Sequence, residues 1–245
     1  MEYNLDSRTS LPPSLRMMHL WPQGDLQELA QRRAIQTTRP IDIWQPQEKQ
    51  RELLRLCGFE EALSGGAVQP AVCECIGYGG AAFGGKTEAL VALGMIACMS
   101  VPGVNVGYFR RQFTELEGAD GPIERSQQLY QKAGGLYNQQ KHAWTFGSRF
   151  NVTSHMRFCH CQHEKDVHSY QSWAFDILLV DEATTFSWYI IDHLIARNRP
   201  SKDSTLPHPF RVMTANPGGI GHSYYMQIFG LEGTLHRGDA EGKEV

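Results

Sequence analysis

The pattern of apolar and polar positions along the chain predicts short strands that alternate with helices. Four apolar runs have the length of buried strands, at 71–76, 104–109, 177–180 and 210–214. The run Ile177–Val180 is apolar throughout and is bounded by acids, which is typical of a central parallel strand. Because helical patterns fall between these runs, we predict an α/β fold with a mostly parallel central sheet flanked by helices.

Helical and hairpin patterns complete this outline. Helices are predicted within 41–63, at 88–97 and, interrupted by glycines, within 114–135. The segments 144–146 and 149–152 are similar to the two arms of a hairpin around Gly147-Ser148. Residues 156–161 read as one more short strand.

Length and composition allow one substantial core with extensions. The chain has 245 residues, enough to bury a single sizeable core. Residues 1–40 are predicted to be an N-terminal extension that prolines interrupt and that contains one helix at 25–35. The core domain is predicted over 41–229, and the Gly- and charge-rich residues 230–245 are predicted to be a tail or linker.

Charge and cysteine usage exclude several classes of protein. The formal net charge is −3 and the pI is near 6.4, so only a local basic groove or a partner chain could supply nucleic-acid binding. The six cysteines form no spaced pair of C-x-x-C motifs, which favours a reduced intracellular chain. We expect no signal peptide, and we expect no membrane partner because the longest apolar stretch, 90–101, is too short to span a bilayer.

The most specific motif is a phosphate-binding loop. Residues 80–87 read Gly-Ala-Ala-Phe-Gly-Gly-Lys-Thr, a complete G-x-x-x-x-G-K-[ST] pattern between a predicted strand and a predicted helix. That context points backbone N–H groups and a helix N-terminus at one spot, which suits a polyphosphate. We expect Gly80, Gly84 and Gly85 to form the turn, Lys86 to reach the β- and γ-phosphates, and Thr87 to hold Mg²⁺. The alternative is an ordinary Gly-rich turn.

A second motif supplies what hydrolysis needs beyond phosphate binding. Four apolar residues followed by Asp181 and Glu182 form a Walker B pattern at the carboxyl end of a predicted strand, where α/β proteins bind ligands. We expect Asp181 to hold Mg²⁺ and Glu182 to act as general base on the attacking water. An Asp-Glu pair at this point indicates the ASCE branch of P-loop ATPases. The alternative is that the two acids only cap the next helix.

Weaker patterns add candidates for sensing and for base recognition. Asn216 or Thr214, at the end of the last predicted strand, could reach the γ-phosphate or the attacking water, unless the segment is a plain Asn-Pro-Gly turn. Gln47 or Gln50 could pair with the adenine edge, because a carboxamide offers one donor and one acceptor. Exposed helix glutamines are nevertheless common.

Two further groups of residues are candidates for catalysis and for metal binding. Arg110 or Arg111 could act as an arginine finger, in cis or towards a neighbouring subunit, although surface arginine pairs are common. Cys159, His160 and Cys161 alternate along a predicted strand and point to opposite faces, and no second ligand pair has zinc-finger spacing. We therefore expect no zinc site there.

In this order the motifs resemble the N-terminal ATPase domain of the large terminase subunit of tailed bacteriophages, the motor that packages DNA into procapsids. The resemblance covers roughly residues 41–229. It rests on the stretches 45–53, 79–90, 109–116, 144–148, 163–171, 179–184 and 214–222.

The resemblance implies a RecA-like P-loop NTPase that hydrolyses ATP with Mg²⁺ to translocate double-stranded DNA. It places Asn216 in a coupling motif and Gln50, with Gln47 as the rival, at the adenine. It places Arg110 or Arg111 where an arginine finger can lie, and the matched glycine-loop stretch adds Glu88 to the nucleotide-binding residues.

For the whole motor, the resemblance implies a homo-oligomeric ring on a portal protein, with a small terminase subunit as partner, in the host cytoplasm. DNA contacts are expected at phosphates, with Arg125, Lys132, Lys141 and Arg149 as candidates. Family members continue into an RNase H-like nuclease domain, and because this chain ends at Val245 we expect no nuclease activity from it.

Other classes of function stay open at this point. A helicase-like ATPase that remodels nucleic acid would use the same core. A nucleotide-binding assembly protein would scarcely turn over, although the intact Glu182 argues against it. A nucleotide kinase would need an acceptor site and a lid, which the pattern does not show.

Overall fold

A computed structural model describes residues 38–80, 84–147 and 152–230. These residues fall, apart from Thr38, in the unit Arg39–Val245. The predicted helix at 25–35, the predicted tail from 231 onwards, and Arg149 lie outside the described residues.

The described strands form one mixed sheet of seven, in the order β1-β7-β6-β2-β5-β4-β3. The strands are, in chain order, β1 (Cys75–Tyr78), β2 (Asn105–Arg110), β3 (Leu136–Asn138), β4 (Ala143–Gly147), β5 (Thr153–His160), β6 (Ile177–Val180) and β7 (Phe210–Thr214). The pairs from β1 to β5 are parallel, and β4 and β3 continue the sheet antiparallel. The predicted mostly parallel sheet is therefore confirmed.

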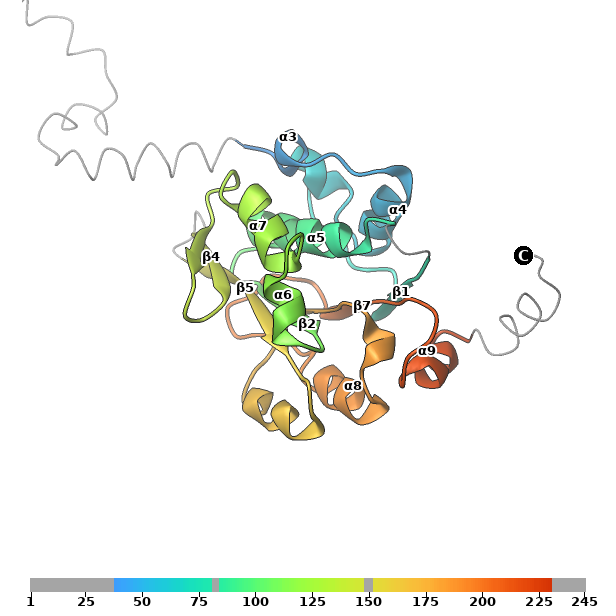
Figure 1. Ribbon diagram of the computed structural model, residues 1–245. Helices are drawn as coiled ribbons and strands as arrows, with labels where there is room; N and C mark the ends of the chain where they lie inside the picture. The colour runs from blue at the N-terminus through green and yellow to red at the C-terminus, as the bar shows by residue number, and fades with distance from the viewer. Residues whose placement is uncertain (1–37, 81–83, 148–151, 231–245) are drawn as a thin grey trace, which may run out of the picture. The chain divides into compact units, whose positions relative to one another are not determined.

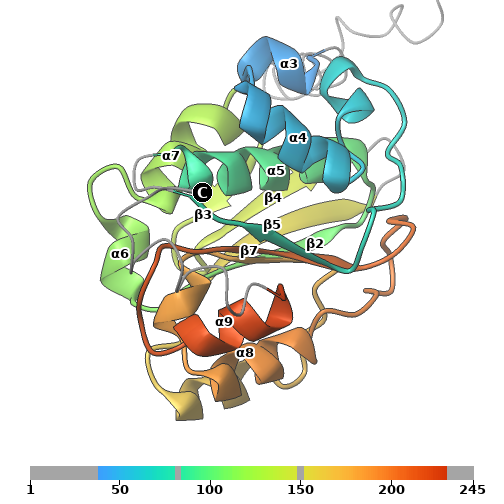
Figure 2. The same cartoon turned by 90° about the vertical axis from the view of Figure 1, so that its right-hand side faces the viewer.

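Helices cover both faces of the parallel part of this sheet (Figures 1 and 2). One layer contains α3 (Pro40–Ile43), α4 (Glu48–Leu56), η3 (Glu61–Ser64), α5 (Lys86–Ser100), α6 (Phe113–Glu117) and α7 (Pro122–Tyr130). The other contains η4 (Glu164–Tyr170), η5 (Ala183–Thr185), α8 (Trp188–Ile195) and α9 (His222–Ile228). Helix α5 is buried from Ala89 to Cys98, as expected of a helix that is apolar all round.

Strand β6 joins the two hydrophobic cores. Ile177 and Leu179 pack into the core beneath α5, whereas Leu178 and Val180 pack into the core beneath α8. Side chains alternate between the two faces of a strand, so a strand buried on both faces must be apolar at every position. This is the physical reason for the uninterrupted run at 177–180, and it fixes the strand that leads to Asp181.

Three strand predictions need correction. The strand predicted at 71–76 is found at Cys75–Tyr78, and it forms an edge of the sheet rather than a buried strand. The strand predicted at 156–161 is found at Thr153–His160 as β5, which pairs antiparallel with β4, whereas residues 149–151 of the predicted second hairpin arm lie outside the described residues. Half of the positions of β5 are half-buried or exposed. Strand β3, with three residues, was not predicted.

Within the described ranges, none of the helices is long and apolar enough to cross a membrane.

Candidate nucleotide-binding and hydrolysis site

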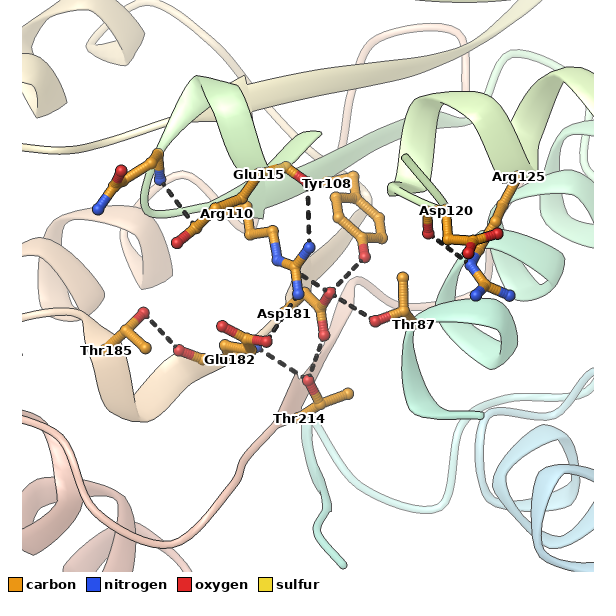
Figure 3. Close-up of polar contacts among 11 residues, drawn as sticks. Thr87, Tyr108, Arg110, Glu115, Asp120, Arg125, Asp181, Glu182, Thr185 and Thr214 are labelled. Atoms are coloured by element: carbon orange, nitrogen blue, oxygen red, sulfur yellow. Dashed lines mark hydrogen bonds and ion pairs between the residues drawn. The ribbon is translucent and has the colours of Figure 1, made fainter. Parts of the chain in front are cut away.

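The predicted site residues come together where four segments of the fold meet. Asp181 directly follows β6, Thr214 ends β7, Arg110 ends β2, and Thr87 lies in the first turn of α5. The carboxyl ends of neighbouring parallel strands share one edge of the sheet, and this edge is where open α/β sheets bind ligands. Figure 3 shows Asp181 at the centre of the group.

The glycine loop has backbone conformations that glycine alone adopts readily. Gly80 has φ of 134° and Gly85, which precedes α5, has φ of 67°. A Cβ on Gly85 would lie 2.8 Å from Nε2 of Gln50, so the Gln50 amide would have to move, and the positive φ would strain any other residue there. Gly84 is exposed, and residues 81–83 of the motif lie outside the described residues. The described part of the loop therefore turns the chain into α5 at Gly85.

Lys86 opens helix α5 and lies against the loop. The residue is 9% exposed, and its Nζ donates a hydrogen bond to the carbonyl of Gly80 at 2.8 Å. Burial lowers the pKa of Lys86, and the nearby charges of Asp181 and Glu182 oppose that shift. A cation at a helix N-terminus whose backbone N–H groups are also available makes a strong site for phosphate.

The two candidate glutamines differ in where the structure places them. Gln50 is 3% exposed, and its Nε2 donates to the carbonyl of Gly85 at 3.2 Å. Its Oε1 accepts the backbone N–H of Gln47 at 2.9 Å, whereas the Gln47 residue is exposed. The structure therefore brings Gln50 to the phosphate loop and leaves Gln47 at the surface of α4.

Glu88 belongs to the same turn of α5 but is bound to other elements. Its carboxylate accepts a hydrogen bond from Nε1 of Trp44 at 2.8 Å and lies 3.7 Å from the guanidinium of Arg125. These contacts tie α5 to the segment after α3 and to α7. The ion pair also gives Arg125, which is one of the candidates for DNA contact, a partner within the chain.

Asp181 is a buried carboxylate with three hydroxyl donors. It is 1% exposed. Its Oδ2 accepts hydrogen bonds from Thr87 at 2.9 Å and from Tyr108 at 2.7 Å, and its Oδ1 accepts one from Thr214 at 2.6 Å. Charge-assisted hydrogen bonds of this kind compensate the cost of burying the carboxylate. Thr87, from the glycine-loop motif, and Asp181, from the acidic motif, are thus in direct contact.

Glu182 has an unusual backbone conformation next to Asp181. Its φ is 54°, in the left-handed region that non-glycine residues rarely adopt. Its backbone N–H donates to the hydroxyl of Thr214 at 3.0 Å, and its Oε1 accepts from Nη2 of Arg110 at 2.7 Å. Such strained residues cluster at functional sites and persist because their surroundings hold them there.

The two candidate arginines have different partners. Arg110 pairs with Glu182, and its Nε lies 3.4 Å from Oδ2 of Asp181. Burial acts to lower the pKa of Arg110, but the charges of Asp181 and Glu182 and the hydrogen bond to Glu182 raise it overall. Arg111 donates to the carbonyl of Thr185 at 2.7 Å, in the turn after Glu182. Only Arg110 therefore contacts the two acids directly.

Asn216 lies beyond β7 and connects to the Walker B turn. Its backbone carbonyl accepts a hydrogen bond from the hydroxyl of Thr184 at 3.0 Å. Its side-chain Oδ1 is buried without a hydrogen-bond partner. No contact between Asn216 and the carboxylates is found in the described residues; Thr214, the other candidate, makes that contact.

Sequence reasoning missed Tyr108. Its side chain is fully buried, and burial, followed by the charge of Asp181, raises its pKa well above the ordinary value, so the hydroxyl stays a donor. The sequence does show a tyrosine in an apolar strand, two positions before Arg110. Predicting its contact with Asp181 required knowing that β2 lies beside β6, which the local pattern does not reveal.

Within the described residues, no three or more His, Cys, Asp and Glu side chains gather where they could hold a metal ion. Cys159 is buried in the core beneath α8, whereas His160 packs against Phe113.

The sequence matches no protein-family model and no curated protein. Solved structures with a similar fold do exist. The large terminase of the thermophilic bacteriophage D6E superposes with a TM-score of 0.56 at 17% identity, over 75% of this chain and 42% of that one. The large terminase ATPase domain of Thermus phage P74-26 gives 0.52 at 13% identity, over 78% and 72%.

The HK97 bacteriophage large terminase gives a TM-score of 0.53 at 9% identity, over 78% of this chain and 38% of that one. The fold is that of large-terminase ATPase domains. This confirms the predicted RecA-like P-loop fold. The chain spans less than half the length of the D6E and HK97 proteins. The D6E terminase has also been solved in complex with ADP and with ATP-gamma-S.

Proposed function

We propose that this chain is a Mg²⁺-dependent ATPase that drives the movement of double-stranded DNA, as the engine of a phage terminase. The observation that carries the proposal is the junction at Asp181, where the P-loop hydroxyl of Thr87 meets the Walker B carboxylate at 2.9 Å. The phosphate-loop pattern and the pair of acids could each arise in a sequence by chance. Their convergence at one edge of the sheet is what nucleotide hydrolysis requires.

The donor set fits Mg²⁺ and a nucleoside triphosphate. Magnesium prefers oxygen ligands and is commonly held by one carboxylate, a hydroxyl and substrate phosphates, and Thr87 and Asp181 offer the hydroxyl and the carboxylate. Bound there, the ion would neutralise charge on the phosphates. Lys86 and the N-terminus of α5 would hold the β- and γ-phosphates. Gln50, beside Gly85, is the better placed of the two glutamines to meet the base.

Glu182 is the proposed general base. It would accept a proton from water while the water oxygen bonds to the γ-phosphorus, and the bond from that phosphorus to the β–γ bridging oxygen would break to release ADP. Thr214 fixes the backbone of Glu182, and Arg110 fixes its carboxylate. Arg110 would also be able to neutralise charge on the transferred phosphoryl group once its pairing with Glu182 is released.

Coupling to movement is proposed to run through Asn216. The hydrogen bond from Thr184 ties the Asn216 backbone to the turn that follows Glu182. A change at the acids would therefore reach the segment between β7 and α9. The ring, the portal protein, the small terminase subunit and the host cytoplasm belong to the same proposal, which the likeness in fold supports.

The test compares ATP hydrolysis by the chain and by Glu182→Gln, with and without double-stranded DNA. We expect Glu182→Gln to lower turnover by about 10² to 10⁴-fold, as removal of a general base does, while ATP-gamma-S still binds. Glu48→Gln, an exposed glutamate in α4, is the matched control and should keep full activity.

Three results would contradict the proposal. Unchanged turnover in Glu182→Gln would remove the general base from the proposed mechanism. Tight nucleotide binding without turnover by the unaltered chain, with or without DNA, would favour a nucleotide-dependent assembly protein. Strand separation by the chain alone would instead favour the helicase-like alternative.

A further inference from the structure

The β5-β4-β3 end of the sheet is buried on only one face. Trp144, Phe146 and Met156 point into the core beneath α5 and α7 and are at most 2% exposed. The opposite face carries Thr145 and His155, which are half-buried, and Leu136, which is 71% exposed. In Figure 1, β4 lies at the side of the sheet away from α9. This second face is therefore available to a partner.

Positive charge gathers on and beside this open face. We define the basic face as Lys141, His155, Arg157, Arg199 and Lys202. His155 and Arg157 lie on β5, and Lys141 lies two residues before the start of β4. None of the five forms an ion pair within the described part of the chain, in contrast to the arginines of α4, which pair with glutamates. The chain has a net charge of −3, so this concentration of cations is local.

A hollow in the basic face orients two of its arginines. The hollow has a volume of about 540 Å³ and is lined by Arg157, Trp173, Arg199 and Lys202, among others. The guanidinium of Arg157 lies 5.2 Å from the centre of the Trp173 ring, and Nη2 of Arg199 donates to the Trp173 carbonyl at 3.4 Å. Cation–π stacking and hydrogen bonding hold the two guanidinium groups in place without neutralising their charge.

The carboxylate of Asp176, at the start of β6, turns into the protein. Asp176 is 1% exposed, and its oxygens accept hydrogen bonds from the backbone and hydroxyl of Ser201 and from the backbone of Asn105. The pKa of His155 is lowered by burial and then by the charges of Arg157 and Lys141. This shift favours the neutral form of His155, so a ligand above the face would feel the combined field of Lys141, Arg157, Arg199 and Lys202.

We propose that the basic face binds the phosphodiester backbone of double-stranded DNA, an inference that rests on the proposed function and gives that function a DNA contact. The cationic side chains, of which Lys141, Arg199 and Lys202 are exposed and Arg157 is half-buried, match phosphate oxygens in charge and in hydrogen bonding. An acidic protein is the less suitable occupant because protein interfaces have apolar, aromatic centres, and Leu136 is the one strongly exposed large apolar residue of this face in the described ranges.

The face lies away from the nucleotide site. Trp173 and Ala174 precede β6, whereas Asp181 follows it, so the hollow and the acids are at opposite ends of the same strand. DNA bound at the hollow would contact backbone phosphates without base recognition, and binding would be independent of sequence and strongly dependent on salt.

The test is fluorescence anisotropy of a labelled DNA duplex of arbitrary sequence, titrated with the chain at several salt concentrations and without nucleotide. The triple variant Arg157→Gln, Arg199→Gln, Lys202→Gln should weaken binding and lower the log–log salt slope by about one for each phosphate that is no longer neutralised. The double variant Arg199→Gln, Lys202→Gln leaves Arg157 on Trp173 and should lower the slope by about two.

The control variant Lys49→Gln, Arg51→Gln, Arg55→Gln removes three positive charges from α4, as many as the triple basic-face variant removes. It should leave the salt slope unchanged. Circular dichroism and DNA-free ATP hydrolysis check that each variant is folded. Equal slopes for the basic-face and α4 variants would overturn the inference, as would polyglutamate that competes as well as unlabelled duplex. If a protein in this comparison has no ATP hydrolysis but keeps its salt slope, the result counts against the proposed ATPase function. It does not count against DNA binding by the basic face.

Discussion

At the scale of single residues, Asp181 unites the site. Hydroxyl groups from three different elements donate to its carboxylate, from Thr87 in α5, Tyr108 in β2 and Thr214 in β7. The same carboxylate is expected to hold the metal, so the hydroxyls fix its orientation before any ligand binds. Thr214 also accepts the backbone N–H of Glu182, which links the metal-binding acid to the proposed base.

Removal of the Tyr108 hydroxyl should destabilise the fold. In Tyr108→Phe, Asp181 keeps its burial but loses one charge-assisted hydrogen bond, and we expect the free energy of unfolding to fall by about 1.5–3 kcal/mol. Urea denaturation measures this change. Tyr189→Phe is the matched control, because that hydroxyl has no hydrogen-bond partner in the described ranges, and it should change stability by less than about 0.5 kcal/mol. Equal losses in both variants would contradict the role assigned to Tyr108.

The residues of the site that local motifs specify could be predicted from the sequence. Lys86, Thr87, Asp181 and Glu182 were predicted because their spacing along the chain is itself the signal. Tyr108 was missed because it reaches Asp181 through the pairing of β2 with β6, a contact between segments far apart in sequence. The roles of the predicted residues stay predictions until they are measured.

At the scale of elements, the contact of α7 with the β4–β5 hairpin depends on one buried serine. Ser126 is fully buried, donates to the carbonyl of Ile123 and accepts from Nε1 of Trp144 at 2.8 Å. Tyr130, also on α7, packs its ring against Trp144 and donates to the carbonyl of Val91 in α5. This cluster closes the covered face of the sheet opposite the basic face.

We expect Ser126→Ala to lower the free energy of unfolding by about 1–3 kcal/mol, because the buried indole N–H of Trp144 would lose its acceptor. The measurement is chemical denaturation followed by tryptophan fluorescence. Ser64→Ala, at an exposed site at the end of η3, is the control and should change stability by less than about 0.5 kcal/mol. A change in Ser126→Ala no larger than in the control would contradict this packing.

Element boundaries were harder to predict than element types. The fully buried β6 was found where predicted, because burial on both faces leaves an unbroken apolar run. Strand β5 starts at Thr153, three residues before its predicted start, because its first residues include the exposed Thr153 and the half-buried His155, which give no apolar signal. Gly107 in β2 is also required by packing, because a Cβ there would lie 2.6 Å from the ring of Phe175. The apolar pattern of the sequence does not reveal this requirement.

At the scale of the whole molecule, the sheet separates two proposed activities in space. The acids follow β6 and the phosphate loop follows β1, whereas the amino end of β6 and the open face of β5 carry the cations. Strand β6 would therefore join ATP hydrolysis at one of its ends to DNA contact at the other. The likeness to large-terminase ATPase domains supports the fold on which this arrangement rests.

The most direct test of the proposed nucleotide site is isothermal titration of the chain with Mg²⁺ and ATP-gamma-S, beside Lys86→Ala and the exposed control Lys49→Ala. We expect a single site in the unaltered chain and in Lys49→Ala, and an affinity about ten- to a hundredfold weaker in Lys86→Ala, because one charge-assisted phosphate interaction is removed. Absence of nucleotide binding in the unaltered chain, or equal affinity in Lys86→Ala, would contradict the proposed site.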